Sequence, residues 1–124
     1  MGRLPVLGGS QGRLVDNPPR LHIRRASKKP TRRLAFADYT RHLLHLTDYP
    51  GITQADAVET LLHEVVHLSA LSLRKHGRRY KQTLAQAAFE CFGVDCRDQV
   101  RRPVYQLDCA IVEALQELGP IPAL

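Results

Sequence analysis

The chain has 124 residues, of which 44% are apolar, enough for one small domain with a core and too few for two full-sized domains. Three cysteines in no paired spacing argue against a disulfide-stapled secreted scaffold. No apolar run approaches the roughly 20 residues that cross a bilayer, and no signal-peptide pattern opens the chain. We therefore expect a cytoplasmic, monomeric protein that does not bind membranes.

The net charge of +6 is unevenly distributed along the chain. Residues 1–41 hold ten basic and two acidic side chains, a net charge of +8. Residues 42–124 hold eight basic and ten acidic side chains, a net charge of −2. The positive charge therefore belongs to the N-terminal third.

The first half of the chain predicts an arm followed by strands. Residues 1–20 are rich in Gly and Pro and poor in bulky apolar residues, which predicts a flexible basic arm. Leu21 and Ile23 alternate with polar residues and predict a short strand that ends at a turn over residues 28–31. Residues 33–40 and 42–47 predict two more strands, closed by turn chemistry at residues 48–51. We expect these three strands to form a small antiparallel sheet.

The second half predicts three helices. Thr53 and Asp56 resemble a capping box, and neither Pro nor Gly interrupts residues 55–74. That helix is apolar on nearly all sides, so we expect it to be central and buried. A second helix is expected after Gly77, ending at about Phe92 with Gly93 as its stop, and a third from Pro103 to Gly119. Strands followed by helices favour an α+β domain over residues 21–118, with a tail at 119–124.

The central helix carries an H-E-x-x-H motif at His63, Glu64 and His67. Residues four apart lie on the same face of a helix, so both imidazoles can reach one metal ion, for which zinc is well suited. Glu64 is offset by one position, where its carboxylate can take a proton from a zinc-activated water without coordinating the metal. An ordinary polar stripe is the alternative, but it would leave polar groups on an apolar helix short of partners.

A catalytic zinc needs a third protein ligand. His76 is our choice, because it lies between the first and second helices and the neighbouring Gly77 permits a tight turn. Glu90 on the second helix is an alternative. The strand histidines are further candidates: His22, His42 and His45.

Other residues have weaker claims to a role in the site. Arg78, Arg79 or Tyr80 could donate to a developing oxyanion, although the helical period favours Tyr80 as a core aromatic. Glu59 could orient the imidazole of His63, although a solvent-exposed helix residue is its default interpretation.

Taken together, the H-E-x-x-H motif, the His-Gly-x-x-Tyr element at 76–80 and a helix closing at Phe92-Gly93 resemble the SprT-like zinc metalloprotease domain. The resemblance covers roughly residues 21–95. It implies a minimal zincin-like fold, with His63, His67 and His76 as zinc ligands and Glu64 as general base. It also implies a cleft for an extended peptide between the sheet's edge strand and the active-site helix. The chain lacks the paired Cys-x-x-Cys of the C-terminal zinc ribbon in many relatives.

A basic cluster stands in and beside the first predicted strand. It suits the phosphates of a nucleic acid, but equally a solubilising arm. The resemblance favours nucleic acid, because Spartan-type relatives cleave DNA-bound proteins. The members are Arg24, Arg25, Lys28, Lys29, Arg32 and Arg33.

The sequence therefore predicts a zinc metalloprotease that hydrolyses peptide bonds, acting on protein or peptide substrates. The alternative is a non-catalytic nucleic-acid-binding or adaptor module with a structural or degenerate metal site.

Overall fold

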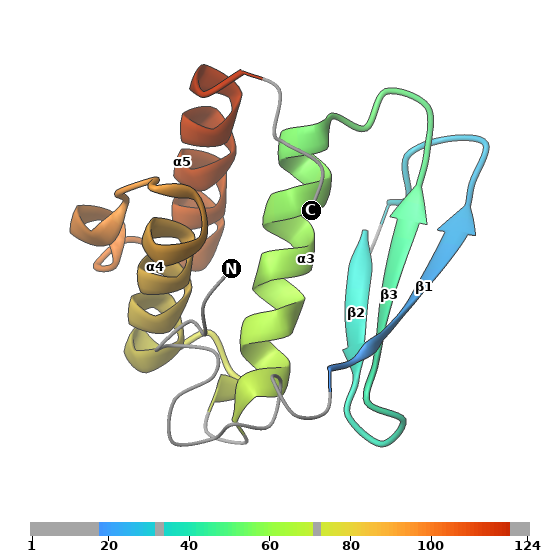
Figure 1. The fold of residues 1–124 in the computed structure, drawn as a ribbon, viewed down its shortest axis with the longest axis horizontal. Coiled ribbons are helices and arrows are strands. Elements are labelled where there is room, and N and C mark those ends of the chain that lie inside the picture. Colours follow the sequence, from blue (N-terminus) through green and yellow to red (C-terminus); the bar gives the residue numbers. More distant parts are fainter. Residues whose placement is uncertain (1–17, 32–33, 71–72, 120–124) are drawn as a thin grey trace.

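The computed structural model describes residues 18–31, 34–70 and 73–119. Figure 1 shows three layers, with one central helix between a sheet on one side and two helices on the other. The elements in chain order are β1 (Arg20–Arg25), β2 (Ala35–Asp38), β3 (Leu43–Asp48), α3 (Gln54–Ser69), α4 (Arg78–Phe92), the short 3₁₀ turn η2 (Arg97–Gln99) and α5 (Val104–Glu117). This arrangement confirms the α+β class.

The sheet is mixed, and the prediction of an antiparallel sheet is wrong for its first strand. The strand order is β1-β3-β2. β2 pairs antiparallel with β3, placing Ala35 opposite Leu46, whereas β1 pairs parallel with β3, placing Leu21 beside Leu44. The antiparallel prediction assumed that strands adjacent in sequence also pair. The link over residues 26–34 is longer than a tight hairpin, so it can carry the chain past β3 to the opposite edge.

Helix α3 begins as predicted and ends earlier. The capping box is present: the Asp56 amide donates to Thr53 Oγ1 at 3.1 Å, and the Thr53 amide donates to Asp56 Oδ2 at 3.4 Å. The helix ends at Ser69, whose hydroxyl donates to the Val66 carbonyl at 2.6 Å, and Ala70 is extended. This early end gives the following link the room to turn back toward the helix.

Helix α3 is buried on two sides, which confirms it as the central helix. Gln54 is its one exposed residue. On one side Val66 joins the main core with side chains of α4 and α5 that have no exposed surface, among them Leu84, Leu107 and Ile111. On the other side Leu68 packs with Leu44 of β3.

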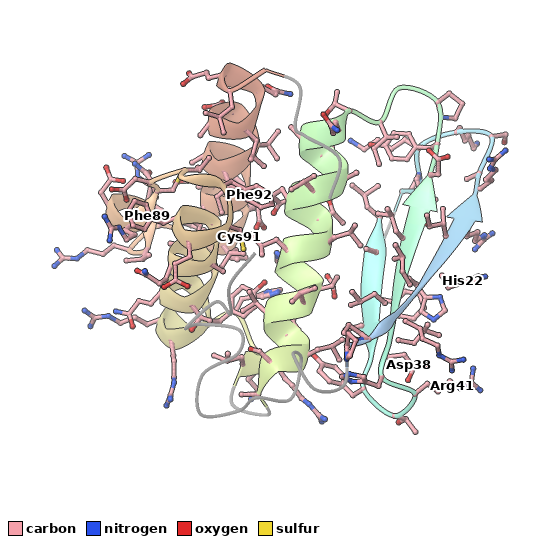
Figure 2. The ribbon with its side chains drawn as sticks, in the orientation of Figure 1. His22, Asp38, Arg41, Phe89, Cys91 and Phe92 are labelled. Atoms are coloured by element: carbon pink, nitrogen blue, oxygen red, sulfur yellow. The ribbon has the colours of Figure 1, made fainter. Side chains whose placement is uncertain are left out.

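Helices α4 and α5 lie close to their predicted bounds. Gly93 ends α4 in the left-handed conformation at a φ of 71°, and its amide donates to the Phe89 carbonyl at 2.9 Å. Pro103 is the N-cap of α5, one position outside the helix it was expected to open. Figure 2 shows Phe89 and Phe92 at the end of α4.

The predicted arm and tail fall largely beyond the described ranges. Residues 1–17 and 120–124 lie outside them, and Arg20 belongs to β1 rather than to an arm. In the described part of the chain, no helix has the length and apolar character needed to cross a membrane. The cysteines Cys91, Cys96 and Cys109 are free thiols, of which Cys96 is buried and Cys109 is exposed.

Replacing Leu84 by Ala should lower the free energy of unfolding by about 2–5 kcal/mol, because the side chain is completely buried and its loss leaves a cavity. Leu118→Ala is the matched control: that side chain is 59% exposed and its loss should change stability by less than about 0.5 kcal/mol. Urea unfolding followed by circular dichroism measures both. Equal effects of the two substitutions would contradict the assigned core.

Candidate metal centre

Three imidazoles meet at one end of α3. His63 and His67 lie one turn apart on the helix, and the link before α4 brings His76 to both. The Nε2 atom of His76 is 2.9 Å from Nε2 of His63 and 2.8 Å from Nε2 of His67. These residues form a group able to hold a metal ion. The structure thus brings together the three histidines that the sequence nominated.

The ring of His67 is held by the turn that follows α3. Its Nδ1 donates to the Leu73 carbonyl oxygen at 2.7 Å, which leaves the lone pair on Nε2. Burial lowers the pKa of His67 to about 4, an effect to which the neighbouring His63 and His76 add. The ring is therefore neutral near pH 7, the form that binds metals.

The ring of His63 is held by α5. Its Nδ1 lies 3.0 Å from Asp108 Oδ1. Burial alone would raise the pKa of Asp108, but hydrogen bonds from His63 and Glu59 outweigh burial and hold that pKa below its ordinary value. An ionised carboxylate accepts only, so Nδ1 of His63 donates to it, and in the neutral imidazole, the form that binds a metal, Nε2 carries the lone pair.

The donor pattern fits a metal ion better than it fits three imidazoles alone. Two Nε2 lone pairs, from His63 and His67, point to Nε2 of His76, which has at most one proton when neutral and can donate to one of them. A cation between the three Nε2 atoms would accept the lone pairs of both His63 and His67. Zinc–nitrogen bonds of about 2.0–2.1 Å in a tetrahedral site separate the nitrogens by about 3.3 Å, so the rings need to spread by about half an ångström.

Glu59 lies beside His63 and helps to hold its ring. The default expectation of a solvent-exposed residue is wrong. Its side chain is buried, and Oε1 lies 4.0 Å from His63 Nδ1. Burial, the hydrogen bond to Asp108 and the Asp108 charge raise the pKa of Glu59 to about 10. Glu59 is therefore protonated at neutral pH and shares its proton with Asp108. Glu59 and Asp108 lie close to His63 and orient its ring, as carboxylates do in carboxylate–histidine–zinc arrangements.

Tyr80 is a core aromatic that packs against the imidazoles. It is 1% exposed, its hydroxyl donates to the His63 carbonyl at 2.8 Å, and its ring stacks on His67 with centroids 4.5 Å apart. Burial raises the pKa of the Tyr80 phenol above its usual range. Since its hydroxyl is already engaged with the backbone, Tyr80 does not provide an oxyanion donor.

A pocket of about 400 Å³ opens beside the three histidines. Its walls are Glu64 and the histidines on one side and β2 on the other, with Tyr39 and Arg74 among the remaining residues. The Arg74 guanidinium lies 4.1 Å from the centre of the Tyr39 ring. Neither residue was predicted from the sequence to belong to the site; Arg78 and Arg79, which were, are exposed and outside this lining.

The alternative third ligands lie elsewhere. Glu90 accepts a hydrogen bond from Gln86 on its own helix at 3.0 Å. His22 and His45 pair with each other across β1 and β3, Nδ1 to Nδ1 at 3.3 Å. His42 precedes β3 with a φ of 52°. None of these residues belongs to the metal-binding groups found among the described residues.

In comparisons with known proteins, no family model matches the chain, and neither a curated protein nor a solved structure does. The assignment of the centre therefore depends on its own geometry.

His76→Ala should abolish stoichiometric zinc binding, because it removes the nitrogen on which the other two imidazoles converge. The exposed position of His76 makes the fold insensitive to this change. Glu90→Gln is the control and should bind one zinc per chain, as measured by plasma mass spectrometry after gel filtration. Loss of zinc in Glu90→Gln with retention in His76→Ala would reverse the ligand assignment.

Asp108→Asn should weaken zinc affinity by about 10- to 100-fold, because the carboxylate that fixes the tautomer of His63 loses its charge. Glu113→Gln removes an exposed carboxylate from the same helix and should leave the affinity unchanged. Competition against a chromogenic chelator measures both. Equal zinc affinities in the two variants would contradict a role of Asp108 in orienting His63.

Proposed function

We propose that the protein is a zinc-dependent peptidase with a minimal, SprT-like zincin architecture. One observation carries the proposal. Two imidazoles on one helix have their Nε2 lone pairs aimed at a third by fixed hydrogen bonds, and Glu64 lines the pocket that opens at that point. The resemblance of the sequence motifs to SprT-like domains supports the same conclusion.

Zinc is the metal that this donor set favours. Three neutral imidazoles suit a borderline-soft divalent ion, and three protein ligands leave a fourth position for water or substrate. When bound, zinc would lower the pKa of a water molecule and polarise the carbonyl of a peptide bond. His63, His67 and His76 would hold it.

Glu64 is proposed as the general base. Its neighbours in the sequence, His63 and His67, point their nitrogens to the metal position, while Glu64 is not part of either metal-binding group. It is half-buried and lines the same pocket. From there its carboxylate would accept a proton from the attacking water and return it to the leaving amine.

The substrate is proposed to bind as an extended strand along β2. This strand is at an edge of the sheet, and three of its residues, Ala35, Phe36 and Ala37, line the pocket across from the histidines. Backbone hydrogen bonds to an edge strand hold a peptide with little dependence on its side chains. Peptide or unfolded-protein substrates fit such a site.

Tyr39 and Arg74 are proposed to donate hydrogen bonds to the substrate carbonyl. Burial, together with the nearby negative charge of Glu64, raises the pKa of Tyr39, while Arg74 opposes that rise, so the phenol keeps its proton at neutral pH. A phenol and a guanidinium at the pocket wall supply donors where negative charge develops during hydrolysis.

Glu64→Gln should retain one zinc per chain and lose at least about 100-fold in the rate of casein or peptide cleavage, because the amide cannot accept the proton. Glu117→Gln, an exposed carboxylate at the end of α5, should keep full activity. Fluorescence release from a labelled casein measures the rate, and mass spectrometry the metal.

Undiminished cleavage by Glu64→Gln would overturn the role of Glu64. A zinc-loaded wild-type chain that cleaves no substrate would instead support the non-catalytic alternative, in which the centre is structural.

A further inference from the structure

The sheet has an outer face, turned away from α3, on which three rings lie in a row across the strands. The register places His22 of β1 beside His45 of β3, and His45 opposite Phe36 of β2. Phe36 stacks on His45 with centroids 4.1 Å apart and planes at 15°, and His45 meets His22 edge-on at 5.2 Å. Phe36 is 38% exposed, and Figure 2 shows His22 on the side of the sheet away from α3.

A basic depression adjoins this ring row. The hollow over the rings has a volume of about 590 Å³ and includes Arg24 and Thr47 in its lining. The same two residues line a second hollow of about 690 Å³, which adds Arg25, Lys28 and Lys29. No acidic side chain is among the described residues that line either hollow.

Asp38, two positions after Phe36 on the same strand, is an acidic residue that is already engaged. Asp38, which lies opposite Leu43, accepts from the Arg41 amide at 3.1 Å, and its Oδ2 lies 4.0 Å from Arg41 Nε. Figure 2 shows both side chains at the end of the sheet near the β2–β3 turn. The charged side chains that line the two hollows, from the rings to the loop after β1, are therefore all cationic, and the exposed Asp48 at the end of β3 lies outside both linings.

We infer that this outer face binds single-stranded nucleic acid. Exposed rings stack with unpaired bases whatever their identity, and a continuous run of cations tracks the phosphates. A duplex hides its bases in the stack and cannot use Phe36 in this way. The basic cluster contains no aromatic residue, and the fold places the rings of His22, Phe36 and His45 around the same hollow as one of its members, Arg24.

This inference goes beyond the proposed peptidase and does not depend on it. Leu44 and Leu46 of β3 face inward and are buried, whereas His45 between them faces outward. The nucleic acid would therefore occupy the side of the sheet opposite the core. Binding measured without zinc tests the inference even where cleavage fails.

The experiment uses the full chain and the fluorescence anisotropy of labelled oligo(dT), oligo(U) and a DNA duplex of equal length. Both single strands should bind more tightly than the duplex. Four cations on the phosphates give a slope of log affinity against log salt of about −3. Phe36→Leu should weaken single-strand binding about fivefold or more while the salt slope stays unchanged.

Lys28→Gln with Lys29→Gln should reduce the salt slope by about half. Both lysines are exposed in the loop after β1, so this variant tests the surface even where Phe36→Leu does not fold. The control, Arg101→Gln with Arg102→Gln, removes the same charge from the exposed link before α5 and should keep the affinity within about twofold.

Three results would overturn the inference. These are no binding of any oligonucleotide, duplex affinity equal to that of the single strands, or equal losses in the lysine variant and the arginine control. Preference between oligo(dT) and oligo(U) identifies the sugar that the surface favours, and either preference supports the inference.

Discussion

The hydrogen bonds at the two Nδ1 atoms of α3 are the constraint on which the candidate site depends. A neutral imidazole that donates from Nδ1 has its lone pair at Nε2, and the Leu73 carbonyl and the Asp108 carboxylate favour this tautomer of His67 and His63. Both lone pairs then meet at His76. Without these acceptors, two histidines four residues apart on a helix would be free to rotate and to exchange tautomers.

Burying this arrangement requires its charges to be balanced. Asp108 and Glu59 lie together beside His63, and two ionised carboxylates there would repel each other. The pKa of Glu59 is raised and that of Asp108 is lowered, so Glu59 carries the proton and Asp108 carries the negative charge. The helix can thus carry polar groups in a largely apolar environment because His63 has a partner on α5 and His67 has partners in the link before α4.

The mixed sheet carries two surfaces of different character, which meet at Ala35 and Phe36 of the edge strand β2. β2 at one edge borders the pocket of the metal centre, and α3 packs on the inner side of β2 and β3. β1 at the other edge is exposed along its whole length and continues into the basic loop. Side chains alternate between the two faces of a strand. One short sheet can therefore line the pocket with its edge strand and inner face while its outer face presents rings and cations.

Features that depend on residues close together along the chain could be predicted from the sequence. These features were the capping box at Thr53, the stop at Gly93, and the placement of His63 and His67 on one helical face, since periodicity and end signals act over a few residues. Other features follow only from the folded arrangement of the chain. The parallel partner of β1, the early end of α3, the buried state of Glu59 and the approach of Asp108 depend on contacts between distant segments. Asp108 stands 45 positions from His63, and no local spacing encodes such a distance.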